Sequence, residues 1–129
     1  MKISAALRAA VAQRAGYRCE YCLRPETQFR HHIDHVIAQK HGGPTSQENL
    51  AYACAFCNLH KGTDLFSALG IRLFNPRVQR WKDHFAVRGS VIEPLTPECE
   101  ATVHMLQMNR DERVRERAAL QTAGKYPRD

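Results

Sequence analysis

The spacing of the cysteines restricts the fold of this chain more than any other feature. Four of its five cysteines form two Cys-x₂-Cys pairs, Cys19 with Cys22 and Cys54 with Cys57, separated by 31 residues. Each pair directs two sulfurs to one point, and two pairs supply the four tetrahedral ligands of a structural Zn²⁺ ion. A redox dithiol and a set of unligated buried cysteines are the competing interpretations, but the presence of two pairs favours zinc. Cys99 has no such partner and is expected to be a small buried apolar residue.

A zinc ion with four cysteine ligands has no open coordination position, so it would hold the fold without taking part in catalysis. The chain has 129 residues and a modest core, and this cross-link is expected to contribute much of its folding free energy. The histidines between the two pairs then remain free for other chemistry. Residues 31–43 read HHIDHVIAQKHGG and hold four histidines and one aspartate.

The charge of the chain favours a polyanionic partner. Nineteen Lys and Arg stand against thirteen Asp and Glu, a net charge of +6, and nucleic acid is the commonest polyanion in cells. Residues 1–18 carry four cations and no acid, and are expected to hold phosphates through Lys2, Arg8, Arg14 and Arg18. No stretch approaches the ~20 apolar residues of a membrane span, and arginines interrupt the apolar run that a signal peptide needs. We therefore expect a cytoplasmic protein that is not bound to a membrane.

Local patterns predict helices on both sides of the cysteine-containing region. A short amphipathic helix is predicted over residues 4–15, with Ser4 as its cap. Asn75-Pro76 predicts the start of a helix, with asparagine as cap and proline at the first helical position. Three residues of that helix would face the core, namely Val78, Trp81 and Phe85.

The last third of the chain predicts a hairpin and two more helices. VRGSVI (87–92) has its turn at Gly89-Ser90, and Thr96 and Asn109 each predict a helix cap. The last helix alternates arginines with acids, a pattern typical of a solvated face, at Arg110, Arg113, Arg115 and Arg117. Residues 125–129 are expected to fray.

The segment between the two cysteine pairs predicts a second cluster of polar residues. Asp34 and His35 lie in an extended stretch, and Asn58 directly follows Cys57 at the start of a helical segment. If the second cysteine pair binds zinc, Asn58 folds back toward the strand of Asp34 and His35. A carboxylate, an imidazole and an amide oxygen would then converge. His31 and His41, by contrast, are expected to be exposed loop residues.

This combination of motifs resembles the HNH nucleases that have a ββα-metal core and a structural zinc. The matching residues are Cys19, Cys22, Asp34, His35, Gly42, Gly43, Asn49, Leu50, Cys54, Cys57, Asn58 and Lys61. The resemblance covers residues 17–64, about a third of the chain. The later LFNPR (73–77), Trp81 and His84-Phe85 are similar to a C-terminal extension found on many small bacterial HNH proteins.

The resemblance implies an α+β fold, with a small zinc-stapled ββα-metal core and peripheral helices at both ends. A single HNH nuclease domain would span residues 1–129. Its parts would be an N-terminal helix (1–16), the zinc and ββα-metal core (17–64) and a mostly helical C-terminal extension (65–129).

The resemblance also implies a role for each matching polar residue. His35 would be the general base that takes a proton from the attacking water, and Asp34 would bind a single Mg²⁺ or Mn²⁺ ion. Asn58 would supply a second ligand to that ion, and Asn49 would brace the loop that positions His35. Three further residues are candidates for phosphate or metal contacts, each against a structural or solvated alternative, namely His32, His60 and Lys61.

The leading interpretation is a metal-dependent HNH endonuclease that hydrolyses DNA phosphodiester bonds, by nicking or by double-strand cleavage. A non-catalytic zinc-ribbon module that binds nucleic acid is the alternative, and a protein-binding zinc finger is a third. The presence of Asp34, His35 and Asn58 favours the enzyme, because binding alone does not need these three residues. With one active site per chain, a monomer would nick and a homodimer could cut both strands, and the sequence leaves both states open.

Overall fold

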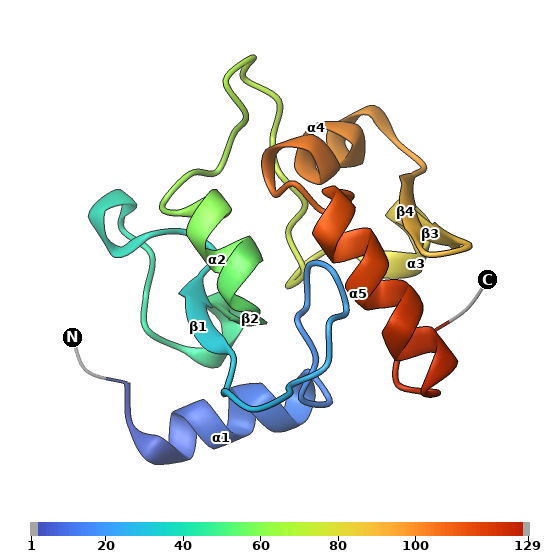
Figure 1. Ribbon diagram of the computed structural model, residues 1–129. Helices are drawn as coiled ribbons and strands as arrows, with labels where there is room; N and C mark the ends of the chain where they lie inside the picture. The colour runs from blue at the N-terminus through green and yellow to red at the C-terminus, as the bar shows by residue number, and fades with distance from the viewer. Residues whose placement is uncertain (1–2, 128–129) are drawn as a thin grey trace.

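The computed structural model describes residues 3–127, so Lys2 lies outside the described part (Figure 1). Helices and two small antiparallel sheets alternate along the chain, which confirms the predicted α+β class. The elements are α1 (Ala5–Arg14), β1 (His32–His35), η1 (Gln39–His41), η2 (Gln47–Asn49), β2 (Leu50–Ala53), α2 (Ala55–Lys61), α3 (Trp81–His84), β3 (Phe85–Arg88), β4 (Val91–Pro94), α4 (Pro97–Met105) and α5 (Asp111–Thr122). None of the helices in this described part is long and apolar enough to cross a membrane.

The helix α1 begins and ends as its sequence predicts. The Ser4 hydroxyl accepts a hydrogen bond from the Leu7 N–H at 3.1 Å and so caps the first turn. At the other end Gly16 takes a positive φ of 65°, a conformation that glycine adopts without strain. The buried Val11 packs with Leu50 and Tyr52. The helix therefore supports the strand β2 from one side (Figure 1).

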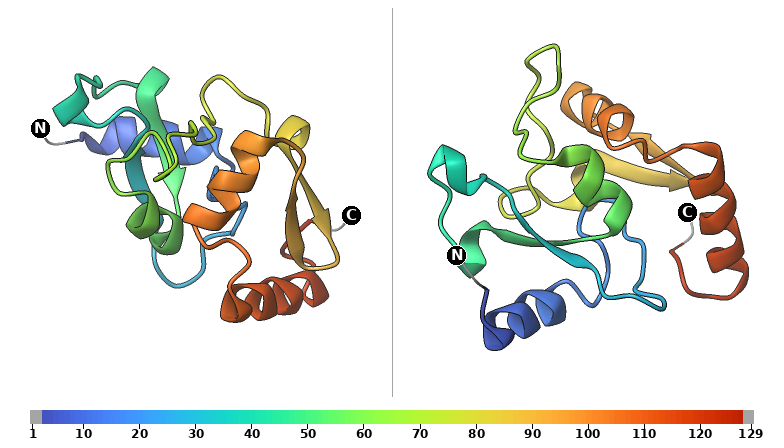
Figure 2. Two further views of the ribbon diagram at one scale, coloured as in Figure 1. Left: turned by 90° about the horizontal axis from the view of Figure 1, so that it is seen from above. Right: turned by 60° about the vertical axis from the view of Figure 1, so that its left-hand side comes forward.

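The strands β1 and β2 form an antiparallel pair, and α2 follows β2 directly. In the register Asp34 lies opposite Ala51 and His35 opposite Leu50. All four residues of β2 are buried, whereas β1 carries polar side chains. The helix α2 packs against β1, so two strands and one helix form a compact ββα unit (Figure 2). This unit places the polar side chains of β1 beside those of α2.

The second hairpin and the helix α4 form as predicted. Arg88 pairs with Val91 around the Gly89-Ser90 turn, and the Thr96 hydroxyl accepts from the Cys99 N–H at 3.3 Å. Buried residues of the C-terminal half pack in one cluster with the cysteine pairs, among them Phe74, Phe85, Ile92, Leu106 and Met108. The two halves of the chain therefore share this cluster, whereas Val11, Leu50 and Tyr52 belong to a second one.

The predicted helix at Asn75 is wrong. The Asn75 side chain accepts a hydrogen bond from the Arg77 N–H at 2.9 Å and forms a local turn, and the short helix α3 begins only at Trp81. Val78 is 79% exposed as a result. Trp81 still faces inward, because its indole N–H donates to Tyr21 O at 2.8 Å. An asparagine side chain that bonds its own backbone competes with helix formation at this point.

Asn109 is not the cap of the last helix, which starts after Arg110. Its side-chain amide instead pairs with Ile92 as a neighbouring strand would, accepting from the Ile92 N–H at 2.9 Å and donating to Ile92 O at 2.7 Å. The prediction that residues 125–129 fray is wrong at Tyr126, which is buried, and residues 128–129 lie outside the described part of the chain. His31 is also buried, contrary to expectation, and its ring packs edge-on against Tyr52.

The prediction of a solvated arginine face is wrong for two of the four arginines, Arg113 and Arg117 of α5. Arg113 and Arg117 are each only 4% exposed, whereas Arg110 and Arg115 are exposed. Residues four apart lie on the same side of a helix, and this side of α5 faces the protein. The charge pattern alone did not reveal which arginines point inward.

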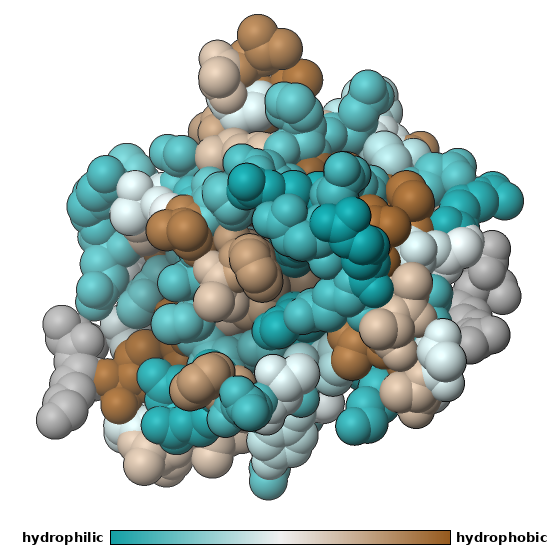
Figure 3. All heavy atoms as spheres, viewed as in Figure 1, coloured by the Kyte–Doolittle hydropathy of each residue, from teal (hydrophilic) through white to brown (hydrophobic). Residues whose placement is uncertain are grey.

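The loop between α2 and α3 protrudes from the molecule (Figure 1). Leu69 lies in this loop and is 88% exposed. In Figure 3 most of the visible surface is hydrophilic, and apolar side chains gather at the tip of this loop. Within the loop, Phe66 and Arg72 form an isolated antiparallel bridge on either side of this tip.

Candidate active site and metal centre

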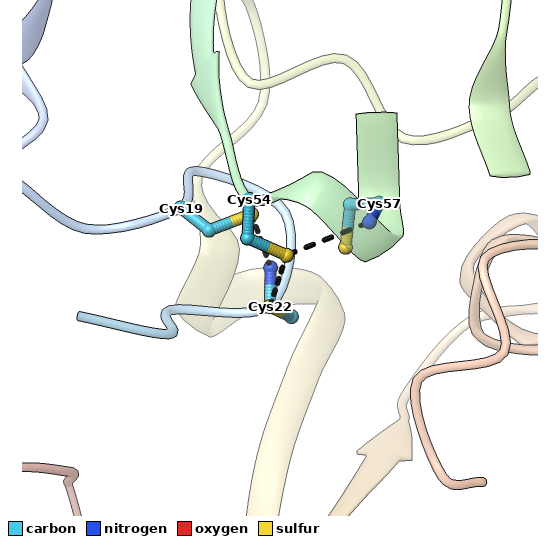
Figure 4. Close-up of side chains that lie close together, drawn as sticks. All are labelled: Cys19, Cys22, Cys54 and Cys57. Atoms are coloured by element: carbon cyan, nitrogen blue, oxygen red, sulfur yellow. Dashed lines mark hydrogen bonds between the residues drawn. The ribbon is translucent and has the colours of Figure 1, made fainter. Parts of the chain in front are cut away.

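The four paired cysteines meet in the interior, as their spacing predicts (Figure 4). All four are buried, and their sulfurs lie within 4.8 Å of one another. The sulfurs of Cys22 and Cys54 are 3.6 Å apart. A tetrahedral Zn²⁺ with Zn–S bonds of about 2.3 Å separates its sulfurs by about 3.8 Å, whereas a disulfide would bring them to about 2.05 Å. The cluster is therefore compatible with a structural zinc ion. Cys99 is buried outside it.

The surroundings of the sulfurs suit thiolates that are bound to a cation. The backbone N–H groups of Tyr21 and Cys22 each donate to Cys19 Sγ at 3.4 Å. Burial, followed by hydrogen bonds from the neighbouring thiols, raises the pKa of Cys19 well above its usual range. Several thiolates are stable in such a place only if a cation offsets their charge. A soft divalent ion such as Zn²⁺ fits this donor set.

Arg113 extends from α5 to this cluster and was missed in the sequence. Its Nη2 lies 3.5 Å from Cys57 Sγ and 3.7 Å from Cys54 Sγ. Burial lowers the pKa of the guanidinium, but the negative charge of the neighbouring thiolates outweighs that effect and the net shift is upward. The side chain therefore stays charged beside the sulfurs.

A second cluster lies between β1 and α2. Asp34 and His35 of β1 and Asn58 of α2 line one open pocket of about 420 Å³. The remaining lining residues are Ile33, Ala38, Gln39, Lys40, Gly62 and Thr63. The structure thus brings together the three residues that the sequence singles out, and adds the exposed Lys40 to their surroundings.

The Asp34 carboxylate is buried and bonded on both oxygens. Tyr21 Oη donates to Asp34 Oδ2 at 2.7 Å, and Lys61 Nζ lies 3.2 Å from Oδ1 and 3.1 Å from Oδ2. Burial raises the pKa of Asp34, although the charge of Lys61 and the Tyr21 hydrogen bond act in the opposite direction. Lys61 is only 2% exposed, so the alternative of a solvated lysine is wrong.

His35 is held by a threonine that the sequence did not reveal. Its Nε2 lies 2.9 Å from Thr45 Oγ1, and Gln39 Nε2 donates to the same oxygen at 3.2 Å. A hydroxyl oxygen can accept from both nitrogens. With Nε2 as the donor, the lone pair of the neutral imidazole lies on Nδ1.

Asn49 clamps the loop that follows β1. The Ile37 N–H donates to Asn49 Oδ1, and Asn49 Nδ2 donates to Ile37 O and Pro44 O, all at 2.9 Å. A Cβ on Gly43 would lie 1.7 Å from Ile37 O and 2.7 Å from Asn49 Nδ2, so only glycine permits this approach. The second glycine of the Gly-Gly pair is therefore required by the clamp.

The other two histidines named as candidate contacts lie outside the lining of the pocket. His32 is exposed at the start of β1, and His60 is half-buried, with its Nδ1 3.5 Å from Gln107 Nε2. Their contact with phosphate or metal stays a prediction.

Two of the N-terminal arginines are engaged within the protein. Arg14 Nη1 donates to Gln47 O at 2.6 Å and its Nη2 to Leu50 O. Arg18 Nη1 donates to Leu23 O at 3.1 Å. Arg14 Nη2 also lies 3.8 Å from Glu20 Oε1, so part of the charge of this segment is compensated from outside it. The carbonyl acceptors leave the charge of Arg18 in place, and the contact of these arginines with phosphates stays a prediction.

The buried ion pair leads to a prediction about stability. Asp34→Ala and Lys61→Met should each lower the free energy of unfolding by about 3–5 kcal/mol, because each leaves a buried charge without its partner. The double variant should lose much less than the sum of the two single losses. Urea unfolding of the zinc-loaded proteins measures the three values, and strictly additive losses would contradict the pairing.

Comparisons with known proteins agree with this arrangement. The HNH endonuclease family model matches residues 19–64. The match begins at the first cysteine of the cluster and ends just after α2, so it includes all four cysteines and the lining residues Asp34, His35 and Asn58. It ends before the LFNPR segment at 73–77. No curated protein and no solved structure matched the chain. Residues 19–64 of this chain are therefore an HNH endonuclease family domain.

Proposed function

We propose that this protein is a metal-dependent HNH endonuclease that hydrolyses the phosphodiester bonds of DNA. The observation that supports the proposal is the shared pocket of Asp34, His35 and Asn58, which lies within the HNH segment. Hydrolysis needs a group that takes a proton from water and a means of offsetting the charge at the phosphate. A carboxylate, an imidazole and an amide in one pocket match those needs.

The oxygens of Asp34 and Asn58 suit a single Mg²⁺ or Mn²⁺ ion. Both are hard ligands, and Mg²⁺ in nucleases keeps several waters while it binds one or two carboxylates and the phosphate of the substrate. Among residues 3–127 the four cysteines are the one cluster of three or more His, Cys, Asp or Glu ligand atoms. A site with two protein ligands would therefore hold its ion weakly until DNA arrives. When bound, the ion offsets negative charge at the phosphate and the leaving oxygen.

His35 would take the proton from the attacking water through Nδ1. The contact of Nε2 with Thr45 Oγ1 positions the ring, and in the tautomer in which Nε2 donates to that oxygen the lone pair is on Nδ1. Asn49 would act indirectly, by positioning His35. Its hydrogen bonds hold the loop between Ile37 and Pro44, and this loop leads to Thr45, which contacts His35. Lys40 is exposed and lines the pocket, and it would contact a backbone phosphate of the DNA.

The alternative is a non-catalytic module that binds nucleic acid through the same fold. One observation favours it: both Asp34 oxygens already contact Lys61, which offsets the charge that would attract a divalent ion. Oδ2 already has two partners, Tyr21 and Lys61, whereas Oδ1 accepts from Lys61 and keeps a second lone pair with which the carboxylate could bind a metal ion in the open pocket.

A plasmid assay separates the two functions. The zinc-loaded protein should convert supercoiled plasmid to open circles in Mg²⁺ or Mn²⁺ and leave it intact in EDTA. Intact plasmid with every divalent metal, under conditions in which the protein still retards DNA in a gel, would assign the chain to the binding module. Linear plasmid as the first product would indicate a homodimer that cuts both strands, and open circles would indicate a monomer that nicks.

A further inference from the structure

The charge of a four-cysteine zinc centre needs compensation from outside the cluster. Four thiolates and one Zn²⁺ together carry a charge of about −2, and this charge would lie in the interior of the protein. Backbone N–H groups at Cys19 and Cys54 offset part of it. Arg113 supplies a full positive charge at two of the sulfurs, and it follows the end of the HNH segment by 49 residues.

The Arg113 guanidinium is fixed in place on both of its edges. Its Nη1 donates to Leu106 O at 2.9 Å and to Gln107 O at 3.3 Å, so that Nη2 is turned toward the sulfurs of Cys54 and Cys57. The plane also lies over the Phe56 ring, with 5.1 Å from Cζ to the ring centroid. Because the planar Arg113 guanidinium is held in this way, its side chain loses little conformational freedom when it donates to the thiolates.

Other contacts close the C-terminal segment over the first cysteine pair. Tyr126 Oη donates to Cys22 O at 2.7 Å. Arg24 and Glu116 form two parallel hydrogen bonds, at 2.6 Å and 3.0 Å. In Figure 1 the helix α5 runs beside the loop that precedes β1, in agreement with these contacts. The sulfurs are therefore enclosed by the C-terminal helix as well as by the HNH segment.

We propose that Arg113 is an outer-sphere partner of the zinc centre, and that the C-terminal helix α5 thereby controls how long the protein retains its zinc. The guanidinium stabilises the thiolates of Cys54 and Cys57 in their metal-bound form through its contacts with both sulfurs. This role concerns the metal centre and holds whether or not the HNH segment cleaves DNA.

Zinc transfer to a coloured chelator in excess tests the proposal, with matched variants on one helix. Arg113→Met keeps the apolar stem and removes the charge. The loss of an outer-sphere partner typically weakens metal affinity about 10- to 100-fold, and we expect this loss to appear as zinc transfer that is faster by about the same factor. Arg117→Met is the control, because Arg117 is equally buried at 4% but bonds Ser90 O and Met108 O instead of sulfur. Arg115→Met controls for the loss of an exposed charge on α5.

A spectroscopic readout separates this role from packing. In the Co²⁺-substituted protein the sulfur-to-metal charge-transfer band should shift in Arg113→Met and stay unchanged in Arg117→Met, because Arg113 donates to the thiolates whereas Arg117 donates to backbone carbonyls. Parental zinc transfer with an unshifted band in Arg113→Met would overturn the proposal, as would equal acceleration by Arg113→Met and Arg117→Met without a band shift. If Arg113→Met does not fold, the zinc transfer rate and the Co²⁺ band are measured on Arg113→Lys instead. Lysine keeps the positive charge but lacks the planar guanidinium that bonds both sulfurs.

Discussion

Removal of the metal from the four-cysteine cluster is expected to unfold the protein. The cluster belongs to the core that also contains Phe74, Phe85 and Leu106, so it cannot loosen without exposing both halves of the chain. Structural zinc contributes about 10–16 kcal/mol in small domains, whereas whole domains are stable by only about 5–15 kcal/mol. Cys54→Ser should therefore give an unfolded or aggregated chain. Far-UV circular dichroism and elemental analysis after extensive dialysis measure the two consequences.

The fifth cysteine provides the matched control for this experiment. Cys99 is as buried as Cys54 but lies outside the cluster, so Cys99→Ala should remain folded and retain one zinc ion per chain. A chain that dialysis against a chelator leaves fully folded and free of zinc would contradict the assigned role of the cluster.

Several features could be predicted from the sequence because neighbouring residues determine them. The Cys-x₂-Cys spacing determines how each pair of sulfurs converges, and Gly89-Ser90 between two short apolar runs determines a hairpin turn. Ser4 and Thr96 cap helices through hydrogen bonds to residues three positions later. The meeting of Asp34, His35 and Asn58 followed from the resemblance and from the short path that connects Cys57 to Asn58.

Other features depend on partners that are distant in the sequence. Lys61 is buried because Asp34 and the carbonyls of His35 and Val36 accept its three protons. Arg113 is buried because sulfur atoms more than fifty residues earlier face it. A pattern of alternating charges does not contain such information, since the same arginines on an isolated helix would be solvated. The contact between Thr45 and His35 also depends on a tertiary interaction, because Asn49 bonds Pro44 O and so positions the neighbouring Thr45 beside His35.

Replacing His35 is expected to have the largest effect on cleavage. A positioned proton acceptor is worth about 10²–10⁴ in rate, so His35→Ala should be slower than the parent by about this factor. The imidazole lies outside the cysteine cluster and contacts Thr45, so zinc content and folding should hardly change. Asp34→Ala is a poorer test of catalysis, because it also leaves the buried Lys61 without its partner.

The deciding measurement is the initial rate of plasmid nicking by the parent, His35→Ala and His41→Ala. It is made with zinc-loaded protein in excess and with saturating Mg²⁺ or Mn²⁺. His41 is the control, since it is an exposed histidine in the same stretch of chain and lies outside the lining of the pocket. We expect His41→Ala to nick like the parent and His35→Ala to be about 10²–10⁴ slower at equal zinc content. Nicking by His35→Ala at the parental rate would contradict the assignment of His35 as the base and, with it, the proposed mechanism.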